Sequence, residues 1–418
     1  MTDSAVGECC GKDNAHCPSL VIMIELAIKM SNPDLIAHDR YQRLFAPYET
    51  LAWLFGMSGS RHYRLNGALM YSAAWLLLIC FCLGRGLSFL VMTKEGFSPV
   101  LVFKCLLVLY ATHCLTSFIM LNRIHRGMLD EFLSLWRFVH CYGDATIPHY
   151  KMMRVVTWIG IFYVVAVSIG NGLFVGLGSV DIVTFPFMDS YFFLKELAVY
   201  NGVIVALTSV HFSMSQTVYS SICFVIYFEF KALADRMAQS TDDELISRLP
   251  EFRQKHFKLQ GLTEHANSML SYYACAVYGL NVPTLIMTVF LVVRETDMDL
   301  FSLAVFIMWV GVLGLQIAIV SVVPSFIHYE AHRPLDRLQK MANTLKRFRH
   351  IQCVFRELSL FNQTLVSQEI GINGGGFFMI TKSMILTLMS VMVTYFALIL
   401  QFAMAAEVPC ACKCDVTS

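Results

Sequence analysis

Residues 377–402 read FFMITKSMILTLMSVMVTYFALILQF and form the last long apolar segment of the chain. A helix needs about 20 residues to cross the hydrocarbon core of a bilayer, so this segment is long enough to span it. Its second half carries several polar side chains that share one helix face with two apolar ones, because their spacing follows the helical period. The residues of this face are Thr394, Tyr395, Leu398, Gln401 and Phe402. A partly polar face of this kind either packs against other helices or lines a wet cavity.

The composition of the whole chain agrees with a membrane protein. Of its 418 residues, 56% are hydrophobic and only 15% are charged, whereas soluble domains carry about 25% charged residues. The formal net charge is +1, and no arm rich in Lys and Arg with interleaved aromatic residues occurs in the sequence. The composition therefore favours the lipid bilayer as a partner and excludes a nucleic-acid-binding protein.

Six further segments have the length and apolar character of membrane spans, so we predict an all-α membrane protein with seven transmembrane helices. The seven predicted spans are 69–92, 99–121, 155–178, 197–227, 271–293, 302–327 and 377–402. The fourth is longer than a bilayer requires, and we expect it to continue as a helix beyond the membrane. Two basic side chains, Arg85 and Lys104, lie near span ends and are expected to reach the membrane interface.

The distribution of basic residues predicts the orientation. Segments 1–68, 122–154, 228–270 and 328–376 hold 24 of the 31 Lys and Arg residues, and the connections on the opposite side hold 4. By the positive-inside rule, the amino terminus lies in the cytosol and the carboxyl terminus outside. The predicted regions are a cytosolic tail, a six-span bundle with two long cytosolic loops, a cytosolic helical stalk with a Gly-rich lead, a seventh span, and a short extracellular tail. Their bounds are 1–68, 69–327 with loops 122–154 and 228–270, 328–376, 377–402 and 403–418.

The long inner segments have helical patterns of their own. Between 335 and 355, apolar residues recur every three or four positions, and a weaker pattern runs from 245 to 269. These helices either lie on the inner leaflet or project into the cytosol and pack together, and we favour projection. Gly371-Ile-Asn-Gly-Gly-Gly376 then allows a sharp turn before the seventh span. This Gly-rich segment is either a hinge that relays motion into that span or a flexible connector.

The end of the seventh span resembles a known signature. A Thr-Tyr pair, five hydrophobic residues and a Gln-Phe pair occur at 394–402, and this pattern is similar to the signature of insect gustatory receptors. The resemblance implies a taste receptor of the plasma membrane in a sensory neuron dendrite. It also implies a tastant-gated, non-selective cation channel without cofactors, assembled as a homo- or heterotetramer, whose cytosolic stalks anchor the subunits to one another.

By the same resemblance, the seventh helix lines the pore. Leu398, Gln401 and Phe402 would face the pore near its outer mouth, where an apolar ring acts as a gate by excluding water. Tyr395 would couple this helix to the neighbouring bundle. Thr394 would bond back to a carbonyl of its own helix.

The ligand, a sugar or a bitter compound, would bind inside the bundle of the first six spans. The signature gives no ligand residues, so the candidates are polar and aromatic residues in the outer or middle thirds of the spans. They are Asn171, Tyr200, Asn201, His211, Tyr278, Asn281, Trp309 and Gln316. For each one alone, a hydrogen bond between helices is the commoner role. The tandem glycines Gly172 and Gly176 are expected to mark close helix packing.

Two other classes of protein fit the sequence less well. A metabotropic seven-span receptor has the opposite orientation, and its Asp-Arg-Tyr motif is matched here only at 39–41, before any span. A membrane enzyme or transporter would need paired acids or several histidine boxes inside the spans. His328 and His332 share a helix face, but one pair does not make such a site, so we predict no catalytic and no metal site.

Overall fold

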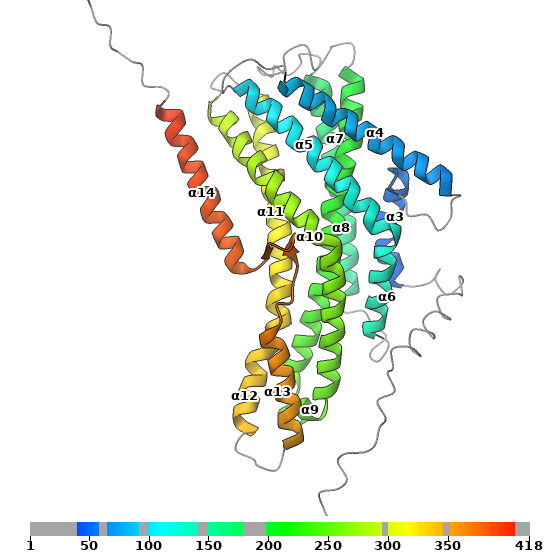
Figure 1. Cartoon of the computed structure of the whole chain (residues 1–418), viewed down its shortest axis with the longest axis vertical. Helices are drawn as coiled ribbons and strands as arrows, with labels where there is room; N and C mark the ends of the chain where they lie inside the picture. The colour runs from blue at the N-terminus through cyan, green and yellow to red at the C-terminus, as the bar shows by residue number, and fades with distance from the viewer. Residues whose placement is uncertain are drawn as a thin grey trace, which may run out of the picture. The chain divides into compact units, whose positions relative to one another are not determined.

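The computed structural model shows a helical protein (Figure 1). It describes residues 40–57, 65–91, 99–140, 149–178, 198–294, 300–345 and 352–405. The chain forms two units, Met1–Phe45 and Ala46–Ser418, and all contacts discussed below lie within the second. The described part of the chain contains seven helical segments long and apolar enough to cross a membrane. The predicted seven-span, mostly helical fold is therefore confirmed.

The first part of the chain forms helix α3, followed by the five helices α4 to α8. Their bounds are α3 Arg40–Leu54, α4 Leu65–Val91, α5 Pro99–Arg123, α6 Leu129–His140, α7 Tyr150–Gly178 and α8 Ala198–Gln239, with a short π-helical turn, Ile124–Met128, between α5 and α6. α8 has 42 residues, so the predicted continuation of the fourth span beyond the membrane is confirmed. The sequence pattern predicted no helix at the position of α3.

The second half of the chain contains two long helices and several short elements. They are α9 Asp242–Ser247, α10 Leu249–Arg294, α11 Leu300–His332, α12 Pro334–Leu345, α13 Gln352–Ser367, the strands β1 Asn373–Gly374 and β2 Phe378–Met379, and α14 Lys382–Ala405. Of the predicted tails 1–68 and 403–418, residues 1–39 and 406–418 lie outside the described residues, as does 346–351 in the middle of the predicted helical stripe.

Close packing of α7 against α8 is built on small residues. A Cβ atom at Gly172 would lie 2.9 Å from the Gly202 carbonyl oxygen, and one at Gly202 would lie 3.2 Å from the Cα of Gly176. Only glycine lets the two backbones approach to this distance. The predicted role of Gly172 and Gly176 in helix packing is confirmed.

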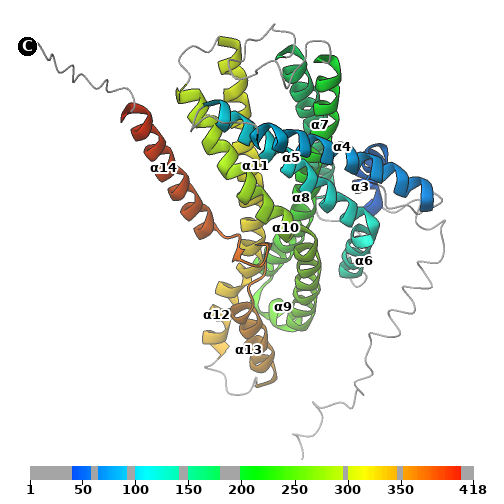
Figure 2. The same ribbon diagram turned by 45° about the horizontal axis from the view of Figure 1, so that its top comes forward.

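Beyond the apolar segments, α8, α10 and α11 continue and pack with α12 and α13 (Figures 1 and 2). We call this region the stalk; it comprises residues 228–270, 328–345 and 352–367. Its interior holds Phe230, Leu259, Leu338 and Phe361, all nearly inaccessible to solvent. Helices that bury one another in this way fit the packed arrangement that the sequence favoured over helices lying singly on a leaflet.

The start of the seventh span was predicted wrongly. Residues 377–381 are not helical, and the helix begins at Lys382. The preceding residues form an antiparallel hairpin in which Asn373 pairs with Met379 and Gly374 pairs with Phe378. Gly375 and Gly376 have φ angles of +63° and +82°, a conformation that glycine adopts without steric cost. We call residues 370–380 the hairpin segment.

α14 lies apart from the other helices along most of its length (Figures 1 and 2). None of its residues from 382 to 399 is buried, and the side chains of Leu386 and Val393 are 72% and 64% exposed. The other spans each bury part of their surface within the chain. A single chain therefore leaves a membrane-length helix without packing partners along most of its length.

Candidate functional site

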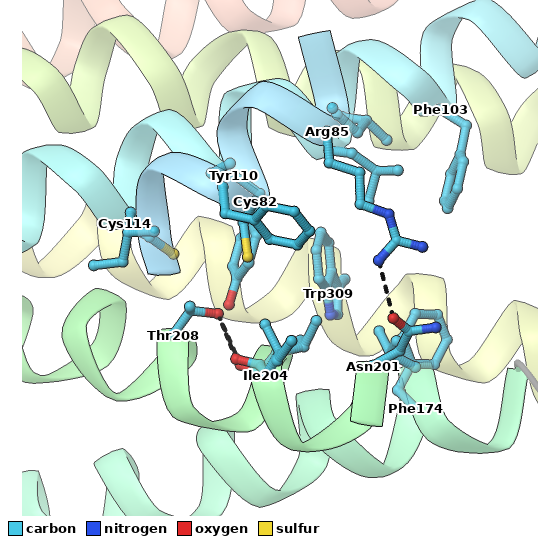
Figure 3. A pocket seen from close by; sticks show the side chains of 18 of the residues that line it. Cys82, Arg85, Phe103, Tyr110, Cys114, Phe174, Asn201, Ile204, Thr208 and Trp309 are labelled. Atoms are coloured by element: carbon cyan, nitrogen blue, oxygen red, sulfur yellow. Dashed lines mark hydrogen bonds between the residues drawn. The ribbon is translucent and has the colours of Figure 1, made fainter. Parts of the chain in front are cut away.

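The main cavity lies among five helices, α4, α5, α7, α8 and α11, and has a volume of about 100 Å³ (Figure 3). One water molecule needs about 10–15 Å³ on this scale, so the cavity has room for a molecule larger than water. Aromatic rings dominate its wall. They belong to Phe81, Phe103, Tyr110, Phe174, Phe306 and Trp309. We call this space the bundle cavity.

One polar pair stands out on this apolar wall. Nη1 of Arg85 on α4 donates a hydrogen bond of 3.0 Å to Oδ1 of Asn201 on α8 (Figure 3). Arg85 therefore does not simply extend to the membrane interface, as its position near a span end suggested. Instead it lines the bundle cavity and fixes the Asn201 amide.

A smaller cavity of about 20 Å³ adjoins the first, since Tyr110 and Trp309 line both. Its volume corresponds to about one water molecule. Asn171 also lines it and joins two helices: its Nδ2 donates to Ser209 at 3.0 Å, and its Oδ1 accepts from Nε1 of Trp309 at 3.2 Å. Trp309 is thus held in a fixed orientation between the two cavities.

A chain of polar side chains crosses the bundle from the smaller cavity. Nδ1 of His113 lies 2.7 Å from Oδ1 of Asn281, and Nδ2 of Asn281 donates to Oε1 of Gln316 at 2.7 Å. Nε2 of Gln316 donates in turn to the Tyr163 hydroxyl at 3.4 Å, which donates to Oε1 of Gln216 at 3.3 Å. Because these groups bond to one another inside an apolar bundle, they fix the relative positions of α5, α7, α8, α10 and α11.

The structure brings together half of the eight predicted ligand residues. Asn201 and Trp309 line the bundle cavity. Asn171, Asn281 and Trp309 line the smaller one. Gln316 lies one hydrogen bond away, as the partner of Asn281.

The other three predicted residues lie elsewhere. Tyr200 is 53% exposed and belongs to the described lining of neither cavity. His211 packs against Trp75 with ring centroids 5.2 Å apart and bonds to the Phe55 carbonyl oxygen. Tyr278 contacts the hairpin segment. Arg85 and Tyr110 line the cavity and were not among the predicted ligand residues, since hydropathy alone does not show which face of a span points inward.

The hairpin segment is held against α10 by several contacts. The Gly375 amide donates to the Ser271 carbonyl oxygen at 2.9 Å, and the Asn373 amide donates to Oδ1 of Asn267 at 2.8 Å. The ring of Phe378 meets that of Tyr278 edge-on at 5.5 Å. Of the two expectations for the Gly-rich segment, a flexible connector does not fit these contacts.

α11 also contacts the chain on either side of the hairpin. Nζ of Lys382, the first residue of α14, lies 3.7 Å from the ring centroid of Tyr329, a cation–π contact. Nδ1 of His328 bonds to the Ile370 carbonyl oxygen at 3.1 Å, and Nε2 of His332 bonds to that of Gln368 at 3.1 Å. Both imidazoles thus bind backbone. Among the described residues, no group of three or more metal-binding side chains occurs.

On α14, the predicted pore residues lie on a helix that one chain leaves uncovered. The Thr394 hydroxyl donates to the Ser390 carbonyl oxygen at 2.9 Å, the backbone bond expected from the sequence. Tyr395 and Leu398 are 53% and 41% exposed, and Gln401 is exposed as well. Phe402 belongs to α14, but its side chain lies outside the described residues.

Comparison with known proteins identifies the family. Residues 47–406 match the family described as 7tm Chemosensory receptor. No curated protein matches the sequence. Among solved structures, the insect olfactory receptor OR5 from Machilis hrabei in complex with eugenol superposes with a TM-score of 0.65 at 14% identity. A second structure of the insect olfactory receptor OR5 from Machilis hrabei superposes with a TM-score of 0.62 at 13% identity.

Both alignments cover 87% of this chain and 100% of the other. At this identity they show a common fold. The family match, in contrast, spans most of the sequence. The chain belongs to the 7tm chemosensory receptor family.

Proposed function

We propose that this chain is a subunit of a gustatory receptor of the plasma membrane, a tastant-gated, non-selective cation channel whose α14 lines the pore. The observation that carries the proposal is the exposure of α14 in a single chain. It is long and apolar enough to span a membrane, yet none of residues 382–399 is buried in a single chain. A helix with no buried residue along this length, and with Thr394 and Gln401 exposed, gains packing when copies assemble around a central axis.

Four subunits around that axis would place one face of each α14 on the conduction path. A ring of Leu398 and Phe402 then closes the path, because a narrow apolar constriction stays dry and blocks ions. Gln401 offers a neutral polar group to cations once the ring widens. The stalk supplies the main contact between subunits, and the tetramer contains either identical chains or related ones.

The ligand site in this proposal is the bundle cavity, with Asn201 and Trp309 on its wall. The receptor OR5, which shares this fold, is titled as a complex with eugenol, so a bundle of this architecture belongs to a protein that takes a small molecule. Ligand binding among α4, α5, α7, α8 and α11 would shift α10 and α11, which contact the hairpin segment that leads into α14. Taste rather than smell is inferred from the motif at 394–402.

Current recording tests the channel. The chain is expressed in cells without added G proteins, and whole-cell currents are recorded while a panel of tastants is applied. We expect ligand-evoked cation currents that persist when G proteins are blocked. Currents that vanish under that block would favour the metabotropic receptor and overturn the channel proposal.

Two variants of α14 test the pore assignment. We expect Gln401→Ala or Phe402→Ala to change ion selectivity or resting leak. Val393→Ala is the control, since residue 393 lies on the opposite side of the helix from the 394–402 face and is likewise exposed. Unchanged selectivity and leak in both pore variants would remove this face from the conduction path.

Epitope tags test the orientation. Under the proposal, an amino-terminal tag is reached by antibody only after the cells are permeabilised, and a carboxyl-terminal tag is reached on intact cells. The opposite pattern would place Phe402 on the cytosolic side. It would also reverse the proposed path from ligand site to gate.

A further inference from the structure

We propose that the ligand of the bundle cavity is a compact, apolar, non-cationic molecule with one oxygen acceptor that takes a hydrogen bond from Nδ2 of Asn201. This inference rests on the proposed function, because it names the chemical class of the ligand that opens the channel. The sequence leaves two ligand classes open, sugars and bitter compounds. This inference favours bitter compounds, and among them it excludes those that carry an ammonium group.

The side-chain nitrogen Nδ2 of Asn201 is a hydrogen-bond donor without an acceptor among the described residues. Its side chain is only 3% exposed, and Nδ2 has no hydrogen-bond partner among the described residues. Oδ1 is engaged by Nη1 of Arg85. Because a guanidinium only donates, rotating the amide by 180° would set two donors against each other. Arg85 therefore fixes the orientation that leaves Nδ2 unpaired.

A buried, unpaired amide donor costs free energy that a matching acceptor recovers. Nearly all buried polar groups in folded proteins have partners, so an exception on a cavity wall indicates a ligand or water that completes the bond. Asn201 lines the bundle cavity. A carbonyl, ether or hydroxyl oxygen of a bound molecule satisfies the requirement, since each accepts a hydrogen bond.

The other polar groups of the wall are already paired within the protein. The Tyr110 hydroxyl bonds to Ser209 at 2.5 Å, and the Thr208 hydroxyl donates to the Ile204 carbonyl oxygen at 3.0 Å. Nε1 of Trp309 donates to Asn171. A sugar would need several unengaged donors and acceptors to replace its hydration, and this wall offers it Asn201 and six aromatic rings. The cavity therefore disfavours a polyhydroxylated ligand.

Charge and size limit the ligand further. Among the described residues that line the cavity, Arg85 is the one with a charge, and no Asp or Glu occurs. A bound ammonium group would find no carboxylate among these residues, so the cost of removing it from water would not be recovered there. The volume of about 100 Å³ is somewhat smaller than that of a 150 Å³ cavity known to bind benzene. The cavity in this conformation thus fits a molecule no larger than benzene, with at most about six non-hydrogen atoms.

Four probes separate these features. Cyclopentanone carries the acceptor, and methylenecyclopentane has the same shape with a CH₂ group in place of the oxygen. Cyclopentylammonium adds a positive charge, and glucose replaces the apolar body with hydroxyl groups. The full-length protein is purified into lipid nanodiscs, and its thermal midpoint is followed against the free concentration of each probe.

The variants test whether Asn201 donates a hydrogen bond to the acceptor of the ligand. Asn201→Leu removes the donor while keeping the shape. Asn201→Asp keeps an oxygen for Arg85 but presents a second acceptor to the ligand, so it serves even if the leucine variant folds poorly. Thr112→Val is the control: its hydroxyl bonds to the Val108 carbonyl oxygen within its own helix, and the residue does not line the cavity.

In the wild-type protein and in Thr112→Val, we expect cyclopentanone to raise the midpoint at about a tenfold lower concentration than methylenecyclopentane, the ratio expected from one buried hydrogen bond. The ratio should fall to about one in both Asn201 variants, and glucose and cyclopentylammonium should have no effect. The inference is overturned if the two isosteres act equally, if the ratio persists in Asn201→Asp, if glucose or the ammonium acts more strongly, or if no probe acts. None of these outcomes tests the channel proposal, which depends on the recorded currents.

Discussion

The ring of Tyr278 on α10 meets the ring of Phe378 in the hairpin segment edge-on, with centroids 5.5 Å apart. The Tyr278 hydroxyl lies 2.8 Å from Oγ of Ser321 on α11. The Tyr278 side chain on α10 therefore contacts both α11 and the hairpin segment. α14 begins at Lys382, only a few residues beyond Phe378. A displacement of α10 against α11 would reach α14 by this route.

The first prediction concerns this ring contact. Phe378→Ala removes it, and an aromatic pair of this geometry contributes about 1 kcal/mol, which corresponds to about a fivefold change in an equilibrium constant. We expect a right-shifted dose–response curve and a smaller maximal current at an unchanged amount of protein on the cell surface. Phe377→Ala is the matched control, because Phe377 is 84% exposed. Equal responses from the two variants would show that the contact does not transmit gating.

The second prediction concerns the turn of the hairpin. Alanine at Gly376 would have to adopt a left-handed conformation at φ +82°, which costs about 1–2 kcal/mol. Alanine at Gly375 carries the same strain, and its Cβ would also lie 3.2 Å from Sγ of Cys275. We expect both variants to lower the thermal midpoint of the purified protein, with Gly375→Ala lowering it more.

Gly279→Ala on α10 is the control for the hairpin variants. A Cβ at that position meets no atom within 4 Å, and alanine is the better helix former by about 1 kcal/mol. The control should leave the midpoint unchanged or raise it. If all three glycine variants shift the midpoint alike, the hairpin conformation has no special role in stability.

The seven spans could be predicted because a bilayer sets their length, and an apolar segment of that length is visible in the sequence. The start of α14 could not be predicted from hydropathy. Phe377, Phe378 and Met379 are as apolar as a span, and hydropathy does not distinguish an apolar hairpin packed on α10 from the first turn of a helix. The contacts that decide between them, such as Gly375 with Ser271, join positions about 100 residues apart.

The ligand site could be predicted only in part for a related reason. Asn201 and Trp309 were identified because polar and aromatic side chains are conspicuous inside apolar spans. Tyr200 was equally conspicuous, but successive helical residues point about 100° apart, so only one of two neighbours faces the cavity. Which one does so depends on how α8 packs against α4 and α7. Arg85 was assigned to the membrane interface for want of that information.

The third prediction tests the packing of α7 on α8. A Cβ at Gly172 would lie 2.6 Å from the Cβ of Ala206, so a larger side chain forces the helices apart, at a cost of about 1–3 kcal/mol. We expect Gly172→Val to reduce folded protein at the cell surface, as measured by surface labelling. Gly170→Val, two residues earlier, is the control because a Cβ there meets no atom within 4 Å. A normal surface level for Gly172→Val would mean that the two helices tolerate a wider spacing.

The fourth prediction concerns a buried carboxylate between α6 and α8. Oε1 of Glu229 accepts from Nε1 of Trp136 at 2.9 Å and lies 2.6 Å from Nε2 of His140. The Glu229 side chain is fully inaccessible to solvent. Removing it would leave both ring nitrogens without this acceptor inside the protein, so the loss is larger than that of an exposed ion pair.

We expect Glu229→Ala to destabilise the protein by about 2–3 kcal/mol, because two buried ring nitrogens lose a hydrogen-bond acceptor. Glu229→Gln should have a smaller effect, because an amide oxygen still accepts one of the two bonds. Glu131→Ala, whose carboxylate is 66% exposed and 4.0 Å from His265, should change the stability by less than about 1 kcal/mol. Thermal unfolding in nanodiscs measures all three. If the alanine variants at 229 and 131 unfold at the same temperature, Glu229 does not hold α6 to α8, and the contact must come instead from the apolar side chains around it.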